Sequence, residues 1–155
     1  MKQKLLVPID GSQPSLRGLD VAIGLARTMD ADIVLVHVVD NTKVARLSYG
    51  EPSVVEPLFE ELRQEGERYL AEAEAAIKSG IVTSSQVAYG NPADEIGKIA
   101  SEIGASMIVM GSHGRTGLRH LLMGSVAEGV IRNAKVPVVI VPAHADDNGA
   151  HHAAA

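Results

Sequence analysis

The chain has 155 residues, of which 46% are hydrophobic and 21% charged, so it is long enough to form one domain with a sizeable core. It contains no cysteine, which excludes disulfides and zinc–thiolate sites. The net charge of −5 and the aromatic content of 3% argue against a nucleic-acid partner, because such binders are normally basic and often stack bases on aromatic rings.

The first half of the chain alternates between strand and helix patterns. Residues 4–9 (KLLVPI) predict a buried strand, and Ser12 is a plausible N-cap for the helix that follows. Residues 32–39 (DIVLVHVV) form a β-branched run that is typical of a strand covered on both faces. Residues 41–56 resemble a long irregular connection. Residues 58–77 then predict an amphipathic helix ended by Ser79-Gly80.

The second half repeats the alternation. Residues 82–90 (VTSSQVAYG) predict a polar edge strand, and Asn91-Pro92 has the N-cap and proline that start many helices. Residues 106–110 (SMIVM) predict a fourth strand, a last helix begins near Val126, and residues 136–142 (VPVVIVP) predict a fifth strand. This order predicts a parallel α/β sheet with helices on both faces.

Domain organisation and location follow from the remaining segments. We expect a single α/β domain over residues 1–142 and a disordered tail over residues 143–155 (AHADDNGAHHAAA), which are small, polar and low in complexity. The opening run MKQKLLVPID is too short for a signal peptide or a membrane span, and Asp10 interrupts it. We therefore expect a cytoplasmic protein with no membrane insertion.

The stretch MGSHGRTGLRHLLMGSV, residues 110–126, places glycines between a predicted strand and a predicted helix. Glycines leave backbone N–H groups accessible to phosphate oxygens, and a helix start adds free donors and the positive end of a dipole. Arg115 and Arg119 carry charge suited to the same anion. The alternative is ordinary turn geometry. The pattern matches neither a Walker A loop nor a dinucleotide-binding fingerprint.

Taken together, PID near the start, VLVHVV in the second strand and MGSHGRTG…LLMGSVAEGVIRNAKVPVVIVP at the end resemble the universal stress protein family. The resemblance covers residues 4–142, and its G-x2-G-x9-G-[ST] pattern is similar to the branch that binds ATP. It implies a Rossmann-like five-stranded sheet in the order 3-2-1-4-5 and a homodimer formed through the last strand, residues 136–141. It leaves open whether Mg²⁺ accompanies ATP.

The resemblance also implies roles for individual residues. Pro8 and Asp10 would lie beside the adenosine, with Asp10 accepting hydrogen bonds from the ribose hydroxyls. Val38 would contact the adenine, and His37 would lie at the edge of that pocket. The implied floor, phosphate approach and phosphate cradle are formed by Met110, Gly111, Ser112, His113, Gly114, Arg115, Gly124, Ser125 and Val126. Simpler interpretations remain for two of these residues: Asp10 as a turn or cap residue, and His37 as a satisfied core histidine.

Three functions remain open at this point. The first is an ATP-binding regulator of the stress response, which signals as a dimer with slow or no hydrolysis. The second is a weak ATPase or an autophosphorylating enzyme, and the third is a dimeric scaffold that binds no nucleotide. Catalysis requires a positioned base and usually a held metal, whereas Asp10 is the only acid expected near the nucleotide. We therefore assign no catalytic residue and no metal ligand, and rank binding first.

Overall fold

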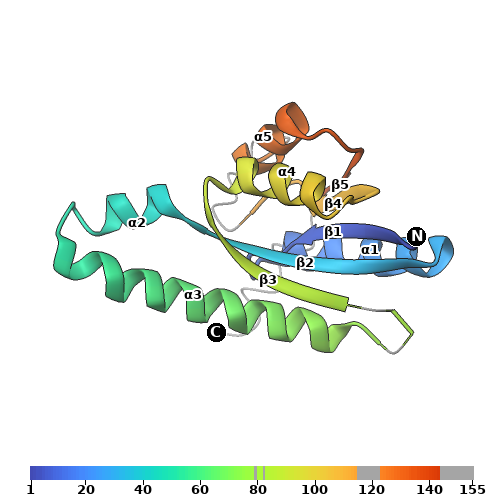
Figure 1. Ribbon diagram of the computed structural model, residues 1–155, viewed down its shortest axis with the longest axis horizontal. Helices are drawn as coiled ribbons and strands as arrows, with labels where there is room; N and C mark the ends of the chain where they lie inside the picture. The colour runs from blue at the N-terminus through green and yellow to red at the C-terminus, as the bar shows by residue number, and fades with distance from the viewer. Residues whose placement is uncertain (79, 82, 115–122, 144–155) are drawn as a thin grey trace.

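The structure, a computed structural model that describes residues 1–78, 80–81, 83–114 and 123–143, is a five-stranded parallel sheet in the predicted order β3-β2-β1-β4-β5 (Figure 1). The strands are β1 (Gln3–Pro8), β2 (Ala31–Asp40), β3 (Thr83–Gly90), β4 (Met107–Gly111) and β5 (Val138–Val141). The helices are α1 (Gln13–Met29), α2 (Asn41–Leu47), α3 (Pro52–Ala76), α4 (Pro92–Glu102) and α5 (Ser125–Asn133).

Local signals start α1 and α4 where the sequence predicted. The Ser12 hydroxyl accepts a hydrogen bond from the Ser15 N–H at 3.2 Å, which caps α1. Asn91 caps α4 in the same way through the Asp94 N–H at 3.2 Å. The polar strand β3 forms one edge of the sheet, as its composition predicted.

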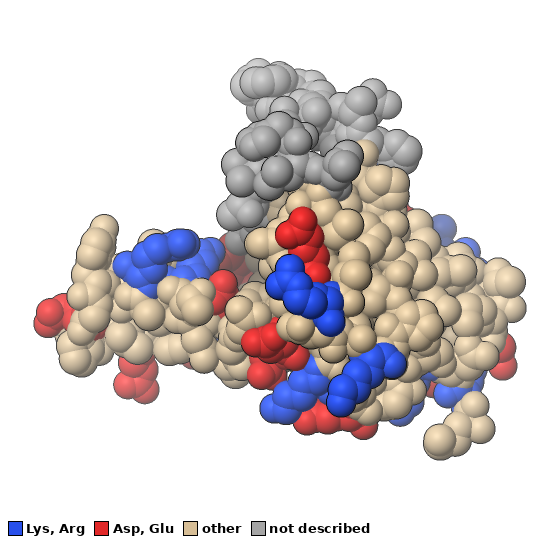
Figure 2. Space-filling view, turned by 90° about the horizontal axis from the view of Figure 1, so that it is seen from above, with Lys and Arg blue, Asp and Glu red and all other residues tan. Residues whose placement is uncertain are grey.

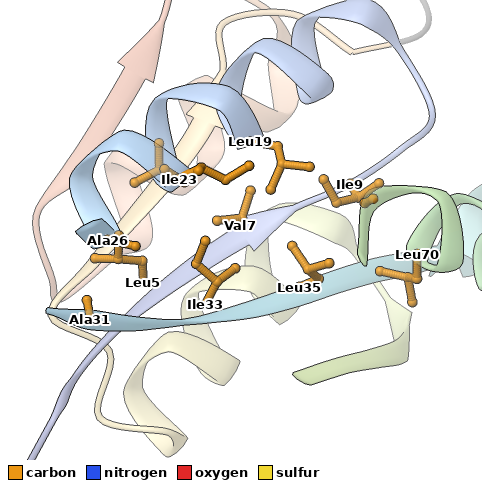
Figure 3. Packing of buried hydrophobic residues seen from close by; sticks show 13 residues of the cluster. Leu5, Val7, Ile9, Leu19, Ile23, Ala26, Ala31, Ile33, Leu35 and Leu70 are labelled. Carbon is orange, nitrogen blue, oxygen red and sulfur yellow. The ribbon is translucent and has the colours of Figure 1, made fainter. Parts of the chain in front are cut away.

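Two buried clusters hold the helices on opposite faces of the sheet. On one face, Leu5 and Val7 of β1 pack against Leu19 and Ile23 of α1, and Leu70 of α3 joins the same cluster (Figure 3). The other cluster unites the opposite face with α4 and α5. Because the middle parts of β1, β2 and β4 are covered on both faces, residues 5–7, 33–36 and 108–110 are apolar at every position rather than alternating.

The prediction of an irregular connection over residues 41–56 is wrong. Asp40 caps the short helix α2 by accepting hydrogen bonds from the N–H groups of Thr42 at 2.8 Å and Lys43 at 3.3 Å. Helix α3 then begins at Pro52, where a proline loses no helical hydrogen bond because first-turn N–H groups have no partner inside the helix. Helix α2 and the first turns of α3 project from the body of the molecule at the left of Figure 1, whereas the second half of α3 packs on the sheet.

The far end of α3 lies within one residue of the end predicted at residue 77. The helix ends at Ala76, with Ile77 as its C-cap in an extended conformation, and so stops before the predicted Ser79-Gly80 end signal. Residue 79 and the tail from residue 144 lie outside the described residues. None of the described helices combines the length and the hydropathy needed to cross a bilayer.

Candidate functional site

The site lies where the order of the strands reverses. Strands β1 and β4 are neighbours in the sheet, yet α1 packs on one face after β1 and α5 packs on the other after β4. The two connections therefore diverge at the carboxyl edge, and a crevice at such a switch point is the usual ligand site of an open parallel sheet. The residues that follow β1 and β4 in the chain include Asp10 and the beginning of the glycine-rich stretch.

Asp10 forms a tight turn immediately after β1. Its Oδ1 accepts hydrogen bonds from the Ser12 N–H at 2.9 Å and from the Ser12 hydroxyl. Its own N–H donates to the Ser15 hydroxyl at 3.5 Å. The interpretation of Asp10 as a turn residue is therefore correct for Oδ1. The other carboxylate oxygen, Oδ2, takes no part in these two hydrogen bonds.

The second oxygen of Asp10 faces the loop that follows β4. A Cβ added to Gly114 would lie 2.7 Å from Asp10 Oδ2, so the carboxylate occupies the side of Gly114 where any other residue would place its side chain. The structure thus brings Asp10 and Gly114, 104 positions apart in the chain, to the same point at the carboxyl edge. A half-buried carboxylate and a bare backbone meet there.

Hydrogen bonds of Ser112 and Gly124 connect the end of β4 to β5 and to the start of α5. The Ser112 side chain is buried; its hydroxyl lies 2.9 Å from His113 Nδ1 and accepts from the Ala143 N–H at 3.3 Å. The Ser112 N–H donates to the Val141 carbonyl at 2.9 Å, and its carbonyl accepts from the Gly124 N–H at 2.7 Å. The polar groups of Ser112 and the N–H of Gly124 are thus engaged in holding β4, β5 and the start of α5 together.

Gly111 has a structural reason to lack a side chain. A Cβ at this position would lie 2.5 Å from the Pro14 carbonyl oxygen, a backbone atom of α1 that has little room to shift. The glycine therefore permits the close approach of α1 to the end of β4. Gly124 is less constrained, since its added Cβ would meet the Ser112 carbonyl oxygen at 3.3 Å.

The start of α5 lies at the same edge, because the Gly124 N–H donates to the Ser112 carbonyl just after β4. Gly124 is the N-cap residue and supplies no side-chain cap, so the first-turn N–H groups from Ser125 onward are not consumed inside the helix. Ser125 is exposed and Val126 is half-buried. The positive end of the helix dipole adds to these donors, a combination suited to an anion.

An apolar wall lies on the α4–α5 face beside this helix start. Val38 and Met110 both belong to the cluster on that face, Met110 buried and Val38 half-buried. Side chains alternate along a strand, so Pro8 points to the same face as the buried Leu6. Three adjacent strands thus supply Val38, Pro8 and Met110 near their carboxyl ends, on one face of the sheet.

The molecular surface on this side carries mixed charge. Figure 2, which looks onto the α4–α5 side, shows Lys and Arg interspersed with Asp and Glu rather than gathered into one basic patch. Arg115 and Arg119 lie outside the described residues. Within the described part of the chain, no group of three His, Asp or Glu side chains is arranged to hold a metal ion.

His37 is part of the scaffold around the site. Its Nδ1 lies 2.8 Å from the Ile9 carbonyl oxygen, which can only accept, so the ring donates from Nδ1. The ring packs on Gly66 of α3, where an added Cβ would lie 2.2 Å from His37 Cδ2. The interpretation of His37 as a satisfied histidine is therefore correct.

The sequence assigns Gly11 only to a turn and Tyr69 only to the apolar face of the helix over residues 58–77, so it does not predict the contact between them. Gly11 adopts a φ of +80°, and the Tyr69 ring from α3 rests directly against it. The spacing of apolar residues marked Tyr69 as part of a buried helix face, but no local pattern tells which segment that face meets.

Comparison with known proteins places these features in a wider context. The sequence matches the universal stress protein family over residues 1–142. A universal stress protein of Methanocaldococcus jannaschii is 38% identical over 141 residues, which cover 90% of this chain and 81% of that protein. The solved structure of another M. jannaschii protein has a TM-score of 0.74 and 31% identity, covering 93% of this chain and 98% of its own. A universal stress protein of Archaeoglobus fulgidus, solved with dAMP, shares the fold at 23% identity with a TM-score of 0.63, covering 90% of this chain and 97% of its own.

Proposed function

Because this chain belongs to the universal stress protein family, we propose that it is an ATP-binding regulator of the stress response, cytoplasmic and dimeric, with slow or no hydrolysis. The observation that carries the proposal is the convergence of Asp10 Oδ2 and the bare backbone of Gly114 at the switch point, beside the open start of α5. A carboxylate and a set of backbone donors at one edge suit a sugar and a phosphate chain.

Each part of the nucleotide has matching chemistry in the described residues. Asp10 Oδ2 is the acceptor for the ribose hydroxyls, since Oδ1 is already bonded to Ser12. The wall of Pro8, Val38 and Met110 suits the adenine face. The first-turn N–H groups of α5 at Ser125 and Val126 suit the outer phosphates. Gly111, Ser112 and Gly124 act mainly by shaping this loop: Gly111 leaves room for the Pro14 carbonyl, and the Ser112 and Gly124 N–H groups are bonded to Val141 and Ser112.

The same geometry favours binding over rapid turnover. Hydrolysis of ATP needs a group that orients or deprotonates water, and Asp10 is assigned to the ribose. Mg²⁺, where it accompanies ATP, would be held chiefly by the phosphates. The His113 ring is held against Ser112, with Nδ1 at 2.9 Å from the hydroxyl. Phosphate release through many turnovers, lost on His113→Ala, would instead establish the enzyme.

The test is a comparison of ATP, AMP and adenosine by calorimetry on purified protein. One charge-assisted hydrogen bond contributes about 1.5–3 kcal/mol, so ATP should bind roughly tenfold or more tightly than AMP if α5 holds the outer phosphates. Ser125→Ala removes the hydroxyl at the phosphate end and keeps the backbone N–H, so it should narrow this preference without abolishing it. Asp10→Ala should weaken all three ligands together, since all three contain the ribose.

Two outcomes separate this proposal from its competitors. Equal affinity for AMP and ATP would mean that the loop does not hold the outer phosphates, and the protein would be an adenosine or AMP sensor. Absence of binding by all three ligands would leave the dimeric scaffold. The A. fulgidus protein that was solved with dAMP has the same fold, so adenine nucleotides are the class to test first.

A further inference from the structure

We infer that helix α3 holds the Asp10 turn in its ligand-binding geometry, with Tyr69 and His37 as positioning residues that do not themselves touch the nucleotide; this inference rests on the function proposed above. The turn contributes one oxygen to the site, and small displacements of such a group are costly because binding groups must be held close to their productive geometry. The contacts on both sides of Asp10 come from residues that α3 and β2 supply.

The residue after Asp10 is held by Tyr69. A Cβ added to Gly11 would lie 2.4 Å from Tyr69 Cε1 and 2.6 Å from two further ring atoms, so the ring fills the space of the missing side chain. With a φ of +80°, Gly11 occupies a backbone region that other residues rarely adopt. The Tyr69 hydroxyl donates to Glu65 one turn earlier in α3, which fixes the orientation of the ring.

The residue before Asp10 is held by His37. The peptide carbonyl of Ile9, which links directly to Asp10, accepts the 2.8 Å hydrogen bond from His37 Nδ1. The Ile9 N–H donates to the Val36 carbonyl at 2.8 Å, so both polar groups of the Ile9 backbone are bonded to β2 or its side chains. The His37 and Tyr69 rings lie 5.9 Å apart between centroids, and Gly66 lets α3 approach closely enough for both contacts.

Local contacts shape the Asp10 turn, whereas contacts with α3 determine where the turn lies. The hydrogen bonds from Ser12 to Asp10 Oδ1 are local and would form in an isolated turn. They do not determine where the turn lies relative to the β4 loop. That placement, which sets Oδ2 2.7 Å from the Cβ position of Gly114, depends on the flanking residues that α3 and His37 hold.

The experiment compares Tyr69→Leu with two variants of the same helix. Phe59→Leu also replaces an aromatic ring by leucine, at a residue whose ring lies 6.2 Å from Tyr89, and Leu70→Ala removes a buried side chain beside Tyr69. We expect Tyr69→Leu to weaken ATP and adenosine alike by about tenfold, a change in binding free energy of about 1.4 kcal/mol. Phe59→Leu and Leu70→Ala should leave both affinities within about twofold, although Leu70→Ala lowers the melting temperature.

Two further measurements identify action through Asp10. In an Asp10→Ala background, Tyr69→Leu should add little further loss, because the group that it positions is gone. Tyr69→Phe keeps the ring over Gly11, so its affinity for ATP should stay within about threefold of the wild-type value. The ring displaces the NMR shifts of the Gly11 α-protons, and this displacement should be lost only in Tyr69→Leu.

The outcomes distinguish the two proposals. Wild-type affinity in Tyr69→Leu, or an equal loss in Leu70→Ala, would overturn the positioning role and leave the proposed function intact. Fully additive losses in the double variant would also overturn it. A wild-type protein that binds neither ATP nor adenosine would overturn the proposed function and this inference together.

Discussion

Glycines with the same appearance in the sequence have different reasons to be glycine. At Gly111 the space for a Cβ is occupied by the Pro14 carbonyl oxygen at 2.5 Å, a rigid backbone atom. At Gly114 it is occupied by a carboxylate oxygen of Asp10 at 2.7 Å, the end of a short side chain. The first contact belongs to the packing of the fold and the second to the site.

This difference predicts opposite outcomes for two alanine variants. Gly111→Ala should lower the free energy of unfolding by about 1–3 kcal/mol, because α1 or β4 must shift. Gly114→Ala should cost less than about 1 kcal/mol of stability but weaken ATP roughly tenfold, because the methyl group displaces the Asp10 carboxylate. Denaturant unfolding and calorimetry on both variants are the measurements. If Gly114→Ala binds ATP normally, Asp10 Oδ2 is not a ligand group.

The position of the candidate site could be predicted from sequence, because residues that follow parallel strands, such as Asp10 after β1 and Gly114 after β4, lie at one edge of the sheet. The hydrogen-bond partners of Ser112 and Gly124 could not be predicted from the sequence. The partners of Ser112 include Val141 and Ala143, which lie 29 and 31 positions further along the chain. No local pattern shows that a backbone N–H expected to bind phosphate is instead consumed by such a distant carbonyl.

At the scale of elements, helices α2 and α3 show where sequence periodicity fails. The buried residues of α3 are Gly66, Leu70 and Ala73, all in its second half. Its first half has no buried residue to produce a clear apolar stripe, and Gly50 and Pro52 are residues that usually mark a loop. The elements with two covered faces, in contrast, were located correctly because burial imposes their pattern.

The exposed first half of α3 is supported by an ion-pair network. Arg63 donates to Glu60 at 2.6 and 2.9 Å and also pairs with Glu67 one turn later. Hydrogen bonds from Arg63, and secondarily from Gln64, lower the pKa of Glu60 to about 2 from the ordinary 4.5. Because the folded-state pKa is the lower one, the stabilisation is present above about pH 4.5 and is lost as the pH falls toward 2.

We therefore predict that NMR titration of the Glu60 carboxyl finds a pKa well below that of an ordinary glutamate. Arg63→Ala should return it toward 4.5, and Gln64→Ala should raise it by a smaller amount. High salt should reduce the difference between the wild type and Arg63→Ala, because these groups are exposed to solvent. A Glu60 carboxyl that titrates at 4.5 in the wild type would contradict the network.

At the scale of the whole molecule, the sheet has a second edge at β5. All four residues of β5 are half-buried, and within the described residues the strand pairs only with β4. The Ile108 N–H donates to the Pro137 carbonyl and the Ser112 N–H to the Val141 carbonyl, so the odd-numbered residues face β4. By alternation, Val138 and Ile140 direct their N–H groups outward, whereas Pro142 has none to offer.

An apolar edge with two outward donors predicts a symmetric dimer formed through β5, in which side-chain packing carries much of the contact. Sedimentation velocity at micromolar concentration should find the wild type as a dimer. Ile140→Pro removes one outward N–H without touching the hydrogen bonds to β4, and the two-fold symmetry removes it twice. We expect this variant to sediment as a monomer at the same concentration, with its melting temperature measured to confirm folding.

Tyr89→Ala, at an exposed aromatic on the opposite edge strand β3, should remain dimeric. A monomeric wild type would overturn the predicted dimer. A dimer that Tyr89→Ala breaks and Ile140→Pro does not would place the interface away from β5.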